Sequence, residues 1–110
     1  NDVVFVFTND EENGQRGARA ALDHPWLKDT LIVLGYEGRG TYGPAYMFET
    51  SPNNYELMKE LAASGAPAHS SSLMYAVHDQ TPNSTDFEHF KEAGFLGYNV
   101  AFVGGLGYYH

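Results

Sequence analysis

The sequence predicts an α/β fold with a mostly parallel, mixed central sheet. Short runs rich in β-branched and aromatic residues alternate with segments of helical spacing, and Gly or Pro marks the junctions between them. The chain has 110 residues, enough for one small core, and 43% of them are hydrophobic. We therefore expect residues 1–110 to form a single layered α/β domain, or part of one.

The first third of the chain predicts a strand, a helix and a second strand. Residues 3–8 form an unbroken β-branched and aromatic run, which is typical of a strand buried on both faces. Residues 14–22 have helical spacing, and Pro25 forbids much continuation. Residues 30–36 are again apolar. This order predicts a right-handed βαβ unit with its two strands parallel.

The remaining residues predict two more helices and three more strands. Ser51 and Pro52 suit an N-cap and a first helical position, and Thr85 with Glu88 forms a capping-box pattern. Gly94 suits the end of that second helix. The expected elements are a strand at 46–50, a helix at 55–62, a strand at 73–78, a helix from 85 with Phe87 and Phe90 inward, and a strand at 98–103.

Composition excludes several functions. A formal charge of −8 argues against a nucleic-acid partner, and the absence of Cys excludes disulfides and thiolate metal sites. No apolar stretch approaches the ~20 residues of a membrane span. The chain begins at Asn1 without Met, so we expect a piece of a longer protein, and its localisation cannot be read from the sequence.

Acidic residues gather where the predicted strands end. Glu11 and Glu12 follow the first strand, and Glu37 follows the second. Ligands of open α/β sheets bind at the carboxyl ends of strands, so these carboxylates could share a cation. With His110 beyond the last strand, the donor set would suit zinc or another borderline divalent metal. The alternative is that these acids simply belong to solvated loops.

Four segments in order resemble metallopeptidase family 28, whose members include dizinc aminopeptidases and the vacuolar membrane protease type. They are VVFVFTNDEENG, LGYEGRGTYGPAYMFETSP, NSTDFEHFKEAG and GLGYYH. The resemblance implies a three-layer α/β/α, zinc-exopeptidase-like fold, present here incompletely. It also implies a peptide substrate, and it favours an extracytoplasmic or membrane-attached parent protein.

The resemblance also implies roles for individual residues. Glu11 falls on the general base that activates a water, and Tyr109 falls on the group that supports the oxyanion. Glu12 and His110 fall on ligands of one zinc ion, and Glu37 falls on a ligand of the other. The parent domain would then be a zinc aminopeptidase that hydrolyses peptide bonds at the N-terminus.

The chain also departs from the family pattern. Thr8-Asn9-Asp10 stands where the family usually has Thr-Asp-Gly, and the family's early His and bridging Asp would lie before Val3. Asp86 matches a position near the substrate pocket, where it could orient substrate or simply begin a helix. We expect the chain alone to bind zinc weakly, to lack activity, and to self-associate through an exposed sheet edge. Two alternatives are a metal-free interaction domain and glutaminyl cyclase chemistry on the same scaffold.

Overall fold

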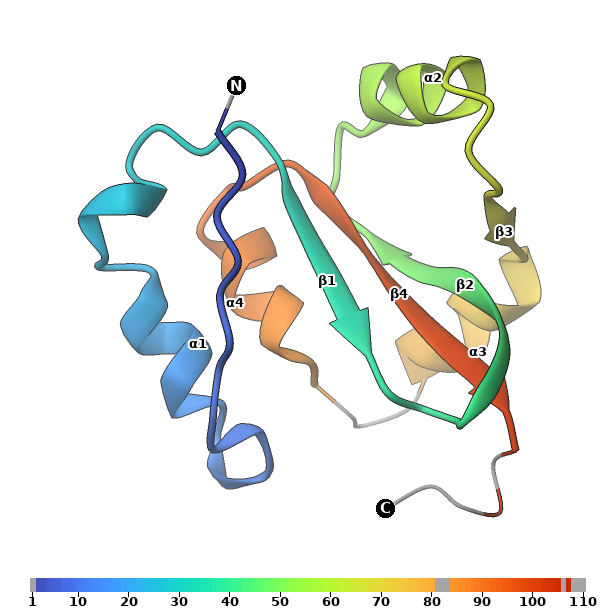
Figure 1. Ribbon diagram of the computed structural model, residues 1–110, viewed down its shortest axis with the longest axis horizontal. Helices are drawn as coiled ribbons and strands as arrows, with labels where there is room; N and C mark the ends of the chain where they lie inside the picture. Colours follow the sequence, from blue (N-terminus) through green and yellow to red (C-terminus); the bar gives the residue numbers. More distant parts are fainter. Residues whose placement is uncertain (1, 81–83, 106, 108–110) are drawn as a thin grey trace.

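A mixed four-stranded sheet forms the centre of the protein (Figure 1). The computed structural model describes residues 2–80, 84–105 and 107. The strands are β1 (Val33–Glu37), β2 (Tyr42–Thr50), β3 (His69–Ser70) and β4 (Gly97–Gly104), in the spatial order β1-β4-β2-β3. β4 runs parallel to β1 and antiparallel to β2. The predicted mixed α/β fold is confirmed.

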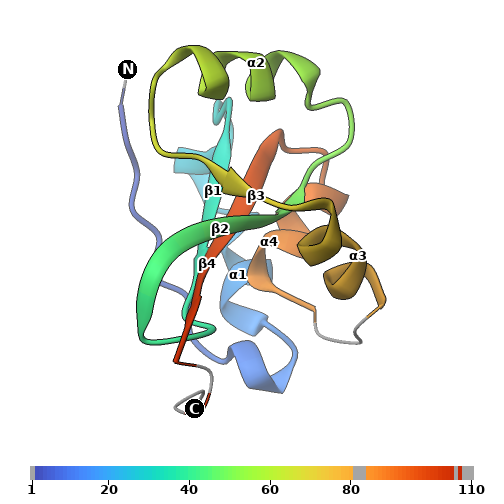
Figure 2. The same cartoon turned by 90° about the vertical axis from the view of Figure 1, so that its right-hand side faces the viewer.

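Helices pack mainly against one face of this sheet. They are α1 (Arg16–Ala21), α2 (Tyr55–Ala63), α3 (Ser72–Gln80) and α4 (Asp86–Glu92), with short 3₁₀ helices η1 (Glu11–Asn13) and η2 (Pro25–Leu27). Figure 2 shows α1, α3 and α4 on the same side of the strands, while α2 lies beyond one end. The core on the covered side contains Ala18, Leu27 and Phe90. Phe87 of α4 is also buried, so both predicted inward aromatic residues are confirmed.

Residues 3–8 do not form a strand, so the predicted βαβ unit is wrong. The segment is extended but has no ladder partner among the described residues, and β1 is an edge strand. Phe5 is 81% exposed and Phe7 is 93% exposed. β propensity mainly reflects how well side chains pack on a sheet. A segment with high β propensity therefore forms a strand only where a neighbouring strand is available for hydrogen bonding. Among the described elements, residues 3–8 have no neighbouring strand, and no helix or sheet buries their side chains.

The predicted strand at 73–78 is also wrong, because these residues lie in α3. The periodicity of hydrophobic residues in so short an apolar run does not distinguish a strand from a helix. The Ser71 hydroxyl accepts a hydrogen bond from the backbone N–H of Leu73 at 3.2 Å, which favours a helix start here. α3 then packs its His78 ring edge-on against Phe48 of β2, with centroids 4.9 Å apart.

The start of α2 differs from the prediction. Asn54, rather than Ser51, occupies the N-cap position. The Ser51 hydroxyl instead accepts a hydrogen bond from the backbone N–H of Gly97 at 3.0 Å. Ser51 is buried, so this bond satisfies a polar group at the junction of β2 with β4.

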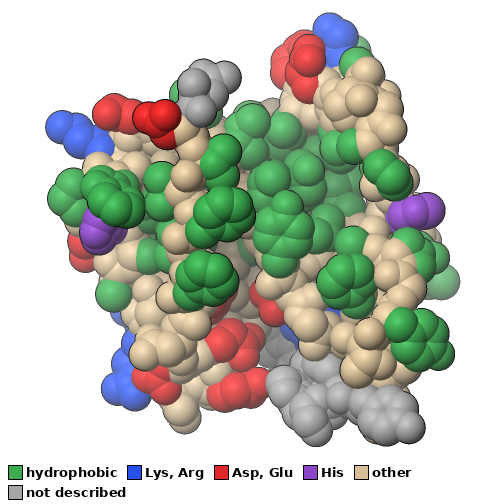
Figure 3. All heavy atoms as spheres, in the orientation of Figure 1, with side chains coloured by type: hydrophobic (Ala, Val, Ile, Leu, Met, Phe, Trp, Pro, Cys, Tyr) green, Lys and Arg blue, Asp and Glu red, His purple; other side chains and the backbone are tan. Residues whose placement is uncertain are grey.

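The face of the sheet opposite α1, α3 and α4 carries apolar side chains and has no helical cover among the described elements; we call it the open face. Leu34 and Tyr36 of β1 pair in register with Tyr98 and Val100 of β4. Figure 3 shows hydrophobic side chains gathered over this region. Within the described residues, no helix is long and apolar enough to cross a membrane.

Candidate active site

Four acidic residues from three separate segments of the chain converge near the end of β1. Glu11 and Glu12 lie on η1, Glu37 is the last residue of β1, and Asp86 is the first residue of α4. The negative charges of Glu11 and Asp86 both act on Glu37, which shows that the three carboxylates lie close enough to repel one another. We call these four residues the acidic cluster.

The loop before the cluster explains how Asp10 replaces the family's Gly. Asp10 has a left-handed backbone (φ 65°), a conformation that Gly adopts freely and Asp tolerates better than most residues. Its carboxylate accepts a hydrogen bond from Asn13 Nδ2 at 2.9 Å and also pairs with Arg16. These contacts hold the turn that leads into Glu11 and Glu12.

Glu11 has a pKa above its ordinary value. Partial burial is the largest cause, followed by the charge of Glu12, a side-chain hydrogen bond with Glu12, and the charge of Asp86. The positive charge of Arg39 acts in the opposite direction. A carboxylate with a raised pKa is a better proton acceptor near neutral pH, which suits a general base.

Glu37 also has a raised pKa, mainly because burial disfavours its charged form. A hydrogen bond from the Asn99 side chain and the charge of Arg39 partly oppose this effect, while Glu11 and Asp86 add to it. A bound cation would favour the ionised carboxylate further.

Asp86 has a hydrogen-bond partner for only one of its two carboxylate oxygens among the described residues. Its Oδ2 atom accepts a hydrogen bond from the Thr8 hydroxyl. Its Oδ1 atom is buried and has no hydrogen-bond partner among the described residues. A buried carboxylate oxygen without a partner carries a desolvation cost that a substrate group or a cation could relieve.

The site is described only in part. Tyr109 and His110 lie outside the described residues. Within the part of the chain that the structure describes, no group of three or more His, Cys, Asp or Glu is close enough to hold a metal ion. The acidic cluster nevertheless fits zinc in two respects. It supplies carboxylate oxygens, and its mutual repulsion is of the kind that a cation relieves.

Sequence reasoning missed several residues around the cluster. They are Thr8, which bonds Asp86, and the buried polar residues Glu49 and Asn99. A signal was present for Asn99, because it is the one amide or charged side chain in the otherwise apolar strand β4. Such a residue is buried only when hydrogen-bonded.

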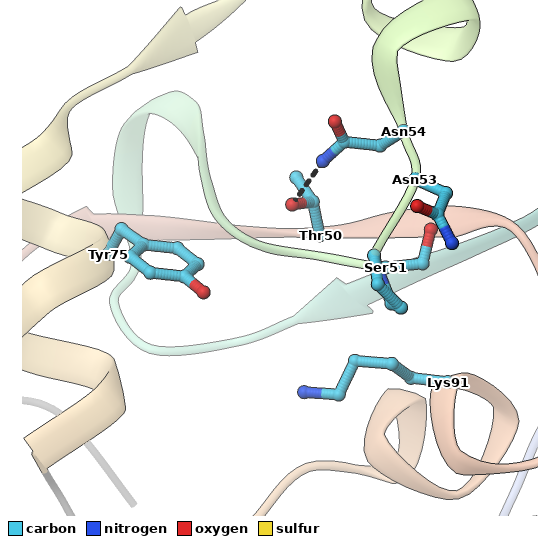
Figure 4. A pocket seen from close by; sticks show the side chains of 7 residues that line it. Thr50, Ser51, Asn53, Asn54, Tyr75 and Lys91 are labelled. Atoms are coloured by element: carbon cyan, nitrogen blue, oxygen red, sulfur yellow. Dashed lines mark hydrogen bonds between the residues drawn. The ribbon is translucent and has the colours of Figure 1, made fainter.

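A separate polar cavity lies between the end of β2, the turn that leads to α2, and helices α3 and α4. Its volume is about 510 Å³. Figure 4 shows Tyr75 of α3 and Lys91 of α4 on opposite sides of it, with Asn54 bonded to Thr50 at its rim. The Lys91 ammonium also bonds Glu49, so this cavity lies on the solvent side of the buried Glu49 carboxylate.

Open α/β sheets bind their ligands at the carboxyl ends of the strands, and the acidic cluster lies at that end of β1. The chain belongs to peptidase family M28, because the model of that family matches residues 1–110. The recognition of metallopeptidase family 28 from the four sequence segments is therefore confirmed.

Curated relatives point to one branch of the family. Vacuolar membrane proteases of Candida tropicalis and Lachancea thermotolerans are each 35% identical over 109 residues, which is 98% of this chain. That of Yarrowia lipolytica is 32% identical over 114 residues. The chain spans only about 12%, 11% and 11% of these three relatives. No solved structure matches the chain.

Proposed function

We propose that this chain is part of the catalytic domain of a zinc-dependent aminopeptidase that holds two zinc ions. The observation that carries the proposal is the convergence of Glu11, Glu37 and Asp86, whose charges act on one another in a chain that belongs to a peptidase family. The names of the relatives favour a membrane-attached whole protein. The substrate would be a peptide with a free N-terminus.

Each residue has a separate task in this proposal. Glu12 and His110 hold one zinc ion and Glu37 holds the other. Bound zinc supplies a Lewis acid and a water of lowered pKa. Glu11 accepts the proton of the attacking water and returns it to the leaving amine. Tyr109 donates a hydrogen bond to the oxygen on which negative charge develops.

The raised pKa of Glu11 supports its task as a base. Burial raises that pKa most, and the negative charge of the neighbouring Glu12 adds to the effect. The negative charge of Asp86 raises the pKa of Glu11 further, so the two carboxylates lie near each other. We assign Asp86 to the substrate pocket, where its carboxylate would orient the substrate.

The experiment compares Glu11→Gln with Glu12→Gln in the whole protein. Glu11→Gln should retain two zinc ions and lose turnover of an aminoacyl anilide by at least ~10²-fold, because an amide cannot accept the proton. Glu12→Gln should lose one zinc ion. Metal content after dialysis and kcat give the answer, with Glu60→Gln on the exposed face of α2 as the matched control. Equal zinc loss in both site variants would overturn the assignment.

A further inference from the structure

The turn that carries Glu11 and Glu12 is closed by its own backbone. The backbone N–H of Gln15 donates to the carbonyl oxygens of Asp10 at 3.1 Å and of Glu11 at 3.2 Å. Asp10, Gly14 and Gln15 all have a left-handed backbone, with φ angles of 65°, 90° and 54°. Residues other than Gly keep this conformation only where surrounding contacts fix it. The position of Glu11 therefore depends on what holds Gln15.

The Gln15 side chain holds this turn to the segment that leads into α4. Gln15 is 4% exposed, and its Nε2 atom donates a hydrogen bond to Ser84 Oγ at 2.8 Å. Gln15 is also the N-cap residue of α1, but its side chain makes no capping hydrogen bond there. Its amide therefore serves the contact with Ser84 instead of its own helix. Ser84 stands two residues before Asp86, so this bond joins the two segments that bear Glu11 and Asp86.

A second hydrogen bond lies on the other side of the acid pair. The Thr8 hydroxyl donates to Asp86 Oδ2, the carboxylate oxygen at the first position of α4. Thr8 precedes Glu11 in the chain and Gln15 follows it. The two bonds therefore bracket the acid pair, and both end within residues 84–86. We call this pair of hydrogen bonds the clamp.

The clamp joins two segments whose carboxylates repel each other. The negative charge of Asp86 disfavours the charge of Glu11, so without other contacts the turn and the start of α4 would move apart. A hydrogen bond on either side of the acid pair opposes that movement. The separation of catalytic groups matters because a misplacement of about 1 Å can cost about 10²-fold in rate.

We propose that Gln15 and Thr8 are positioning residues that hold the turn of Glu11 against the start of α4. The inference rests on the proposed function, because it takes Glu11 as the general base and Asp86 as part of the substrate pocket. Gln15 acts through the turn that carries the base, so its loss should slow proton transfer without weakening substrate binding. Thr8 acts through Asp86, so its loss should weaken substrate binding.

The first test measures kcat and KM of the whole protein for an aminoacyl anilide. Gln15→Met keeps the length of the side chain and removes its amide, so kcat should fall about 10- to 100-fold with KM nearly unchanged. Ser84→Ala should give the same fall, and the double variant should fall no further, because both changes break one bond. Asn54→Leu is the matched control, because it breaks an amide–hydroxyl bond with Thr50, outside the clamp, and should leave both constants unchanged.

The second test concerns Thr8. Thr8→Val removes the hydroxyl with little change of shape, so KM should rise about 10-fold with kcat little changed, and Thr8→Ser should restore KM. A merely structural role would lower kcat in both Gln15→Met and Thr8→Val and leave KM unchanged in both. Wild-type KM in Thr8→Val, wild-type kcat in a folded Gln15→Met, or additive losses with Ser84→Ala would overturn the inference.

A third test needs no turnover. Hydrogen exchange of the whole protein without substrate reports directly on how firmly the turn is held. Ser84→Ala changes an exposed residue, so the variant should fold even if Gln15→Met does not. A peptide that spans residues 9–17 should exchange about 5-fold faster in Ser84→Ala than in wild type. Unchanged exchange would overturn the inference, because the turn would then be held without Ser84.

Glu11→Gln separates this inference from the proposed function. If that variant keeps wild-type turnover, Glu11 is no general base and the proposed function is wrong at this residue. If Glu11→Gln loses turnover while Gln15→Met and Thr8→Val keep wild-type constants, only the positioning role is wrong.

Discussion

At the scale of single residues, the acidic cluster combines groups that destabilise one another. Glu37 and Glu11 both have raised pKa values, and burial is the largest cause for each. A functional site often keeps such unfavourable arrangements, because the same burial and repulsion tune a base or attract a cation. Arg39 offsets part of the repulsion on both carboxylates without removing it.

This arrangement predicts a pH dependence of stability for the 110-residue chain in the presence of a chelator. A carboxyl group whose pKa is raised by folding stabilises the fold fully at pH below its unfolded pKa, and this contribution is lost as the pH rises through the folded value. Glu37 therefore contributes less to stability at pH 7 than at pH 4. Glu37→Gln should raise the unfolding free energy at pH 7 relative to wild type, and the gain should vanish toward pH 4. Glu60→Gln, an exposed acid on α2, is the control in urea unfolding at both pH values. An equal gain at both pH values would contradict the prediction.

At the scale of the elements, local patterns predicted most of the fold. The spacing of Phe87 and Phe90 identified α4, and the apolar runs at 30–36 and 98–103 identified β1 and β4 within a few residues. The errors at 3–8 and 73–78 have a common cause. An apolar run shows that a segment prefers burial, but the partner that buries it is set by tertiary structure.

Prediction of the candidate site from the sequence had the same limit as prediction of the fold. Glu37 does end a strand, as expected, but Glu11 and Glu12 follow an extended segment that is not a strand, so neighbouring parallel strands do not account for their place beside Glu37. The burial of Asn99 opposite Gly35 could not be predicted, because this pairing depends on the register between β1 and β4. Register is fixed by side chains that lie far apart in the sequence.

The packing between β1 and β4 predicts that Gly35→Ala is strongly destabilising. The new Cβ atom would lie 2.5 Å from Asn99 Oδ1 and 3.3 Å from Phe87 Cβ, and both neighbours are buried. Overpacking of this kind typically costs about 1–3 kcal/mol. Gly38→Ala, one residue beyond β1, meets nothing within 4 Å and should change stability by less than ~0.5 kcal/mol. Urea unfolding of both variants tests this, and equal stability would show that Asn99 has room to move.

At the scale of the whole molecule, the sheet has helices on one face and apolar side chains on the other. Tyr36 of β1 is 76% exposed, and Phe102 of β4 lies half exposed on the same open face. The strand β1 is also an edge, so its outer backbone groups have no ladder partner among the described residues. Large exposed apolar patches and free edges both favour association between chains.

We therefore predict that the 110-residue chain on its own self-associates through the open face. A double variant, Tyr36→Lys with Phe102→Lys, should shift it toward monomer at the same concentration, because two charges would be buried without partners in any face-to-face contact. Tyr55→Lys on α2 is the matched control, since Tyr55 is equally exposed but lies on the helix beyond the sheet end. Light scattering across a concentration series measures the change. Association that persists in the double variant would place the contact elsewhere, with the exposed segment 3–8 as the next surface to alter.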